Sequence, residues 1–267
     1  MWQTPAVPST RTNTTSTTGT RTTETTTTAP GVRSTPRERA RAAFTRDILD
    51  IARRQIAESG AAALSMRAVA RELEVASSAL YRYFPSRDAL LTALIIDAYS
   101  ALADRAQAAH ARVPADDFLG RWQAVCHAVR DWARDSPHEY ALVYGSPVPG
   151  YAAPQETTEA AGRFPYLLLG VVRDAWAAGA LGEPADAETP ALSAQMAEQA
   201  RYLATATGLE DLPDVVLVRA VIAWTQVFGA VSLELFGHLV GGFADNAPFF
   251  ATSVDLMAHA VGLRART

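Results

Sequence analysis

The most informative part of the chain is residues 64–91, LSMRAVARELEVASSALYRYFPSRDALL. Ser65 is placed to cap a helix that runs through Leu73, because serine oxygens accept hydrogen bonds from the free N–H groups of a first helical turn. After a three-residue turn, Ser77 is placed to cap a second short helix through Phe84. Two helices paired across so short a turn are typical of a helix-turn-helix, a DNA-binding motif.

The apolar residues of this stretch recur at helical spacing, and an earlier helix offers a surface on which they can pack. Phe44, Ile48 and Ile51 are spaced three or four residues apart, which predicts a helix over 37–58 that ends before Gly60. We expect five apolar residues to lock the two short helices against it: Val69, Leu73, Val75, Leu80 and Phe84.

The second short helix has an inward and an outward face. At about 100° per residue, Leu80 and Phe84 share the inward face and Arg82 lies roughly opposite. Ser78 and Ala79 lie beside Arg82, and their small side chains would let the helix end approach base edges in a major groove. The outward face is therefore the predicted reading surface.

Groups suited to phosphate surround this surface. Tyr81 and Tyr83 flank it with hydroxyl groups that can donate hydrogen bonds. Ser86 is placed to cap a long helix over 86–108, and helix N-termini attract anions through free N–H groups and the helix dipole. Arg67 and Arg87 lie in first helical turns, where they can add charge-assisted hydrogen bonds.

The rest of the chain is also predicted to be helical. Helices are expected near 115–135, 137–144, 155–179, 185–206, 213–240 and 246–263, separated by glycine and proline. We therefore expect an all-α fold, in which a three-helix DNA-binding head over 37–91 joins a larger α-helical ligand-binding and dimerisation body over 92–267. Residues 1–36 are rich in threonine and poor in apolar residues, and we expect them to form a disordered tail.

Charge is distributed unevenly along the chain of 267 residues, whose net charge is −4. Residues 1–91 carry 13 Arg against 8 Asp and Glu, whereas residues 92–267 carry 11 Arg against 20 Asp and Glu. A basic front on an acidic body indicates that only the front meets a polyanion.

Several other classes of protein are not supported. No eighteen residues in a row are apolar, so we expect no membrane span and no membrane partner. The chain start does not resemble a secretory signal, and the single cysteine, Cys126, allows no intramolecular disulfide, which fits a cytoplasmic protein. The five histidines show no metal-ligand spacing, and Cys126 and His127 would point about 100° apart on a helix. We therefore expect no enzyme activity, no metal and no cofactor.

The head resembles the DNA-binding domain of the TetR family of bacterial repressors. The resemblance rests on Gly60, on Ser65-x-Arg-x-Val-Ala70, on the run Val75–Phe84 and on Ser86-Arg-Asp-Ala-Leu-Leu91. The family commonly has lysine at the position of Arg87 and often glycine at that of Ser78. It implies phosphate contacts from Ser65, Tyr81 and Arg87, and groove contacts from Ser77, Ser78, Ala79, Arg82 and Tyr83.

A second resemblance lies late in the chain. The run from Ala223 to Gly237, with a Trp, a Gly and a Leu-Glu pair, is similar to one type of TetR C-terminal domain, and Trp132 followed by Pro137-His-Glu-Tyr140 fits the same type. The family implies a homodimer on a palindromic double-stranded DNA operator. The apolar residues expected in a dimer interface are Trp224, Phe228, Val231, Leu235, Val254 and Met257.

The body is rich in large aromatic residues, which suit an apolar or aromatic small-molecule inducer. The candidates for a ligand pocket are Trp122, Trp132, Tyr140, Tyr144, Phe164, Trp176 and Tyr202. We expect a transcriptional repressor that such a ligand releases from its operator by tilting the helix over 86–108. Two alternatives stay open: a DNA-binding regulator that takes no ligand, and an activator.

Overall fold

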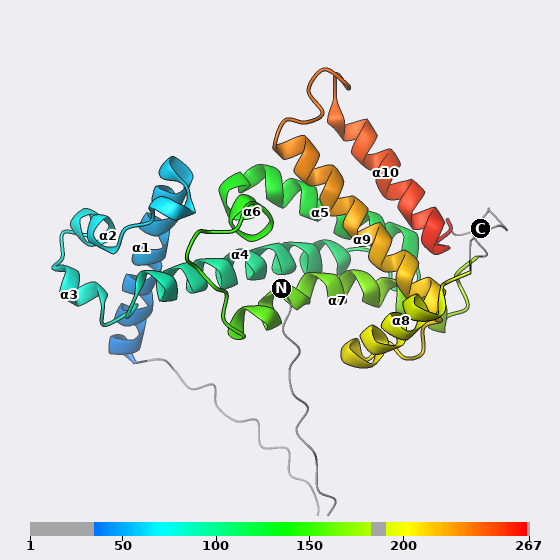
Figure 1. Cartoon of the computed structure of the whole chain (residues 1–267), viewed down its shortest axis with the longest axis horizontal. Helices are drawn as coiled ribbons and strands as arrows, with labels where there is room; N and C mark the ends of the chain where they lie inside the picture. The colour runs from blue at the N-terminus through cyan, green and yellow to red at the C-terminus, as the bar shows by residue number, and fades with distance from the viewer. Residues whose placement is uncertain (1–34, 183–190, 266–267) are drawn as a thin grey trace, which may run out of the picture. The chain divides into compact units, whose positions relative to one another are not determined.

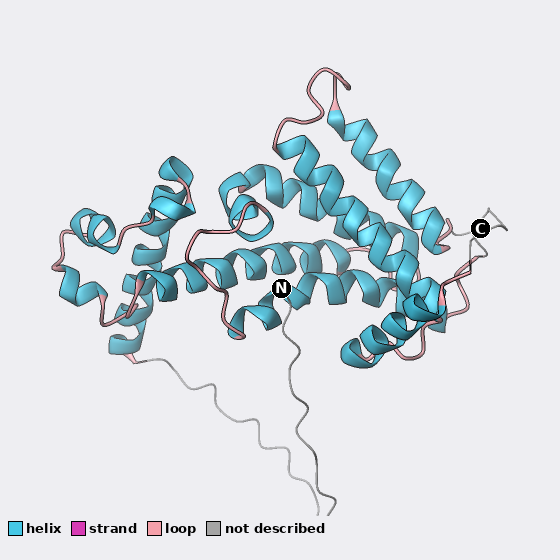
Figure 2. Cartoon of the chain, viewed as in Figure 1, coloured by secondary structure: helices cyan, strands magenta, loops and turns pink. Residues whose placement is uncertain are grey.

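The computed structural model describes residues 35–182 and 191–265, and within them every regular element is helical, which confirms the all-α class (Figures 1 and 2). The elements are α1 Pro36–Ser59, the short 3₁₀ helix η1 Ala61–Ala63, α2 Met66–Glu72, α3 Ser77–Leu80, α4 Arg87–His110, α5 Phe118–Asp135, α6 Pro137–Tyr144, α7 Glu156–Ala177, α8 Ala194–Thr207, α9 Asp214–Leu235 and α10 Asn246–Val261.

The chain divides into two compact units, Met1–Ala40 and Arg41–Thr267. The described part of the first unit, residues 35–40, holds the exposed first turn of α1. Most of the predicted tail over 1–36 lies outside the described residues.

Within the second unit, the head has a hydrophobic cluster of its own. Ile48 and Ile51 of α1 pack there with Val69, Leu80 and Phe84, which are all buried as predicted. Leu73 and Val75 are half-buried against the same cluster. The cluster continues along α4 as far as Ile95, so the predicted domain boundary at residue 91 falls inside a continuous helix.

Two of the three predicted serine caps are present. Ser65 Oγ accepts a hydrogen bond from the Ala68 N–H at 3.4 Å, and Ser86 Oγ accepts one from the Ala89 N–H at 3.0 Å. The prediction for Ser77 is wrong, because Ala76 occupies the cap position of α3 and makes no side-chain hydrogen bond there. The second short helix is also shorter than predicted, because it ends at Leu80. Residues 81–83 form turns, in which the Tyr83 N–H donates to the Leu80 carbonyl at 2.9 Å.

The body surrounds a second hydrophobic cluster built from α4 to α10. In Figure 1, α5 and α7 run along α4, and α9 and α10 lie beside each other. Its largest fully buried side chains are Trp122, Tyr140, Phe164 and Phe250. Trp122 Nε1–H donates to the Val254 carbonyl at 3.1 Å, which ties α5 to α10 through a satisfied polar atom.

Two helices of the body differ in extent from the prediction. The helix predicted over 185–206 begins at Ala194, where Ser193 Oγ accepts from the Met196 N–H; residues 183–190 lie outside the described part. The helix predicted over 213–240 ends at Leu235, because Gly237 adopts φ 79° and the chain turns there. Such a left-handed conformation costs glycine little, so it terminates helices readily.

Among the described residues, α9 is long and apolar enough to cross a membrane by length and composition alone. Core helices pass the same criterion, and α9 buries Ala220, Ala223 and Val227 in the body cluster. Its Glu234 also pairs with Arg130 of α5 inside the protein. We interpret α9 as a core helix, and the expectation of no membrane partner stays a prediction.

Candidate nucleic-acid interface

The connection between α2 and α3 is a tight turn that brings two short helices together. The Val75 N–H donates to the Ala70 carbonyl at 3.0 Å, and the Glu74 N–H donates to the Arg71 carbonyl at 3.1 Å, which closes the C-terminal end of α2. Glu74 adopts φ 55°, a left-handed conformation that is unfavourable for a residue with a Cβ. Val75 can then turn into the head cluster, and α3 begins at Ser77.

Four of the nine residues proposed to contact DNA have exposed side chains: Arg67, Ser78, Tyr81 and Arg82. Within the part of the chain that the structure describes, neither Arg67 nor Arg82 makes a side-chain hydrogen bond or ion pair. By contrast, the exposed Arg54 of α1 is paired with Glu72 of α2 at 2.6 Å. Among the described residues these two guanidinium groups of the helix-turn-helix are unpaired, as is that of Arg71 on α2, so an anion can reach them.

The remaining candidates are half-buried, and they are Ser65, Ser77, Ala79, Tyr83 and Arg87. Tyr83 packs its ring against Phe44, with the ring centroids 5.0 Å apart, and the Arg41 guanidinium lies 5.2 Å from its centroid. These contacts orient α3 on α1. Tyr83 therefore supports the head, whereas Tyr81 extends into solvent.

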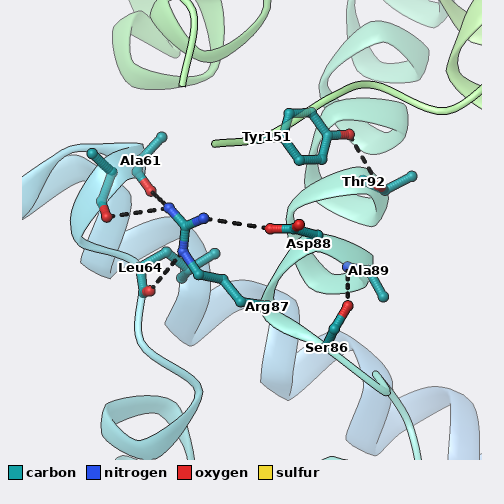
Figure 3. Close-up of polar contacts among 9 residues, drawn as sticks. Ala61, Leu64, Ser86, Arg87, Asp88, Ala89, Thr92 and Tyr151 are labelled. Atoms are coloured by element: carbon teal, nitrogen blue, oxygen red, sulfur yellow. Dashed lines mark hydrogen bonds and ion pairs between the residues drawn. The ribbon is translucent and has the colours of Figure 1, made fainter. Parts of the chain in front are cut away.

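The Arg87 side chain is engaged inside the head (Figure 3). Its Nε–H donates to the Leu64 carbonyl at 3.1 Å, and one terminal nitrogen donates to the carbonyls of Ala61 and Ala62 at 2.9 and 3.1 Å. The other terminal nitrogen lies 3.4 Å from the Asp88 carboxylate. Arg87 thus connects the start of α4 to the segment that enters α2, a role that sequence reasoning did not foresee. The phosphate contact that the family resemblance implies for Arg87 is tested by none of these contacts.

A second arginine connects the head to the body. Arg53 of α1 pairs with Asp50 at 2.6 Å, with Asp97 of α4 at 2.8 Å and with Glu139 of α6 at 3.2 Å. Burial raises the pKa of Asp97 and of Glu139 above the ordinary carboxyl value, and the Arg53 charge opposes the rise. Arg53 gave no signal in the sequence because its partners on α4 and α6 are distant along the chain.

The predicted ligand-pocket aromatics lie together only in part. The ring centroid of Tyr140 lies 6.2 Å from that of Trp132 and 5.2 Å from that of Tyr144. Tyr144 and Phe164 both pack against the Phe228 ring. Trp122, Trp132, Tyr140 and Phe164 are buried in the body core, and Tyr144 is half-buried beside them. Tyr140 donates or accepts a hydrogen bond with Ser232 Oγ at 2.7 Å. Trp176 and Tyr202 are exposed. Of the seven, only Tyr144 lines the cavity of about 770 Å³ formed by the end of α1, α6 and the end of α9.

The predicted dimer residues are also divided. Phe228, Val231 and Val254 are buried in the core of their own chain. Trp224, Leu235 and Met257 are half-buried against that core. The apolar residues that α9 and α10 expose are different ones, and they include Ile222, Leu233 and Leu256.

Comparisons with known proteins agree with this architecture. The family model described as bacterial regulatory proteins, tetR family, matches residues 48–94. The model described as tetracyclin repressor-like, C-terminal domain, matches residues 122–257, which is more than half of the chain. The two matches cover the head and the body; the Trp, Gly and Leu-Glu subtype of the body stays a prediction.

Individual relatives agree with the family models. The chain is 39% identical to the HTH-type transcriptional regulator Rv1816 of Mycobacterium tuberculosis over 202 residues, covering 76% of this chain and 85% of the relative. The regulatory protein SCO4313, whose crystal structure is known, is 37% identical in sequence to this chain. Its structure matches this one with a TM-score of 0.67 over 84% of this chain and 98% of that chain.

A more distant structure shares the fold alone. It is a TetR family transcription regulator from Marinobacter aquaeolei VT8, 17% identical with a TM-score of 0.55, over 85% of this chain and 100% of that one. TetR-family regulators are transcription factors and not enzymes. The chain therefore belongs to the TetR family and is a DNA-binding transcriptional regulator with an N-terminal helix-turn-helix head.

Proposed function

We propose that this regulator is a cytoplasmic repressor that binds a palindromic operator as a homodimer and leaves it when a small apolar or aromatic ligand binds. In this proposal α3 enters the major groove and Ser78, Ala79 and Arg82 meet base edges. Ser65, Arg67 and Tyr81 meet phosphates and set the position of the head. The observation that carries the DNA-binding mode is that the guanidinium groups of Arg67 and Arg82 on the helix-turn-helix are exposed and pair with none of the described residues.

The operator can be found by selection from DNA that flanks the regulator's own gene, followed by mobility-shift titration. Arg82→Ala should weaken binding to the selected site by about 1–3 kcal/mol and relax the sequence preference at one position. Arg134→Ala is the matched control, because Arg134 is exposed on α5, outside the helix-turn-helix. Equal losses on selected and random DNA would mean that Arg82 contacts only phosphate.

A stripe on α9 supports the homodimer. Ile222 and Leu233 are 52% and 46% exposed, and Gly229 lies between them on the same helical face. A Cβ built on Gly229 would meet no atom within 4 Å, so a second helix can approach closely there. Leu256 of α10, 60% exposed, adds apolar surface on the neighbouring helix. We propose that α9 and α10 pack against the same two helices of a second copy.

Leu233→Glu should convert the dimer to a monomer at micromolar concentration, because two glutamates would meet at a two-fold interface. Met196→Glu is the control, since Met196 is exposed on α8. Sedimentation velocity measures both masses. A dimeric Leu233→Glu protein would exclude this face, and its operator affinity would show whether dimerisation is required for DNA binding.

The repressor and the activator alternative differ in one measurement. A reporter placed behind the selected operator should be less active when the regulator is present and should recover when the regulator is deleted. Higher activity in its presence would identify an activator. If no compound in a thermal-shift and mobility-shift screen releases the regulator from its operator, the alternative of a regulator that takes no ligand is favoured.

A further inference from the structure

A cavity lies where the head meets the body. It measures about 770 Å³, within the range of about 300–1,000 Å³ that small-molecule sites occupy. The head contributes Ile56, at the end of α1, and the segment Gly60–Ala62. The body contributes α6, the α6–α7 connection over residues 145–149 and the end of α9. In Figure 1 that connection passes from α6 across α4 to α7.

The lining is mostly apolar and includes two aromatic rings. Tyr144 and Phe236 supply the rings, and Leu142 and Val148 supply aliphatic surface. The polar lining groups include the imidazole of His138 and the hydroxyl of Ser146. No carboxylate or guanidinium group is among the described residues that line the cavity. An ionised ligand would find neither a carboxylate nor a guanidinium partner here, so the cavity suits an uncharged one.

The wall on the head side leads directly into the DNA-binding motif. The carbonyls of Ala61 and Ala62 are the same groups that accept hydrogen bonds from Arg87. Leu64, the third acceptor, directly precedes Ser65, the N-cap of α2. A ligand that displaces the Gly60–Ala62 segment would therefore strain both the Arg87 contacts and the start of the helix-turn-helix.

The wall on the body side is also coupled to the head. Val148 lines the cavity and packs against the hydrophobic cluster of the head. Three residues later Tyr151 joins the same cluster, and its hydroxyl lies 2.9 Å from Thr92 Oγ1 of α4. The connection over 145–151 therefore touches the cavity, the head and α4 at once.

We infer that the cavity at the head–body junction is the effector site and that it takes an uncharged planar aromatic ligand with a hydroxyl or carbonyl group. The effect of the bound ligand is transmitted to α2 through the Arg87-bound segment 61–64. This inference rests on the proposed release from DNA by a ligand. It moves the ligand from the aromatic core of the body to the junction. A ligand here acts by preferring the conformer in which the segment is displaced.

The test uses the full chain and Prodan, an uncharged naphthalene ketone whose fluorescence changes in apolar surroundings. Ser146→Phe and Ala62→Phe each place a phenyl ring in the cavity, from opposite walls. Both positions are exposed, so the substitutions should not disturb folding. Ala153→Phe is the matched control, because Ala153 is exposed on the α6–α7 connection but does not line the cavity.

We expect both cavity variants to bind Prodan at least roughly tenfold more weakly than the natural chain and Ala153→Phe, a loss of about 1.4 kcal/mol. Prodan should also release the natural chain and the control from the selected operator, and release neither cavity variant. Equal Prodan affinity in all four proteins, or none in the natural chain, overturns the site. Prodan binding without release overturns the coupling to α2.

Operator affinity is measured in the absence of Prodan for all four proteins. If the natural chain prefers no DNA sequence, the proposed function fails, whatever Prodan does. If the natural chain binds its operator but Prodan affinity is insensitive to the two cavity variants, only the inferred site fails.

Discussion

Removing the Arg87 guanidinium should destabilise the head by about 2–3 kcal/mol. Hydrogen bonds to a charged group contribute about 1.5–3 kcal/mol each. The acceptors on Ala61 and Leu64 are partly buried, whereas the bond to Ala62 is exposed and water can replace it. The Arg87 side chain is 29% exposed, so we reduce each of the two partly buried bonds to about 1–1.5 kcal/mol.

Urea denaturation followed by circular dichroism measures this loss. With a slope of about 1–3 kcal/mol per molar urea, typical of small proteins, the midpoint of Arg87→Ala should fall by about 1 M. Arg67→Ala is the matched control, because Arg67 is exposed and makes no side-chain hydrogen bond or ion pair with the described residues. Arg87→Lys should fall between the two, since one ammonium cannot reach all three carbonyls.

DNA binding separates this structural role from a phosphate contact. Each phosphate contact contributes about 0.9 to the slope of log K against log salt. Arg67→Ala should lower that slope by about this amount, and Arg87→Ala should leave it unchanged. An Arg87→Ala protein of unchanged urea midpoint and lower salt slope would refute the reasoning and would make Arg87 a phosphate contact.

Three further predictions concern single side chains. Arg130→Ala should lower the free energy of unfolding in urea by about 3–5 kcal/mol, because Glu234 would stay buried without its partner at 2.7 Å. Arg130→Met combined with Glu234→Leu should lower it less, and the reverse order would contradict this account. Burial raises the pKa of Glu139, so this carboxyl holds its proton more tightly in the folded protein than in the unfolded chain. The free energy of unfolding therefore falls as the pH rises from about 4.3 through the raised pKa. Glu139→Gln should remove this part of the slope, as urea midpoints measured across that range would show, and an unchanged slope would exclude the carboxyl as its source. Glu74→Gly should raise the free energy of unfolding slightly, by up to about 1 kcal/mol, because φ 55° suits glycine. The urea midpoint should rise accordingly, and a lower midpoint would show that the Glu74 side chain makes a favourable contact.

The local signals in the sequence predicted the elements that local physics controls. Ser65 and Ser86 cap the helices that they were predicted to cap, because each serine oxygen bonds an N–H three residues further along. The cap prediction for Ser77 was wrong because Ser77 is already the first helical residue of α3, and Ala76 takes the cap position. The end of α9 was predicted five residues too late, at residue 240, because the chain already turns at Gly237.

Distant contacts were beyond the sequence pattern. The periodicity of α9 identifies apolar residues on several faces, but it does not say which face meets its own chain. The structure buries Phe228 and Val231 and leaves Ile222 and Leu233 exposed. The same ambiguity applied to the aromatics of the body, where Trp122 is buried and Trp176 is exposed. A helix that is apolar nearly all round needs its neighbours before its faces can be assigned.

By itself, the sequence determined that this protein carries a helix-turn-helix head on a helical body, because caps, turns and helical periodicity act over a few residues. It also placed Arg82 on the outward face of the second short helix, where the structure exposes it. Only the tertiary structure decided that Arg87 is bound to the carbonyls of residues 61–64 and that a cavity opens between head and body. Both depend on how segments far apart along the chain pack together, and no local pattern encodes that packing.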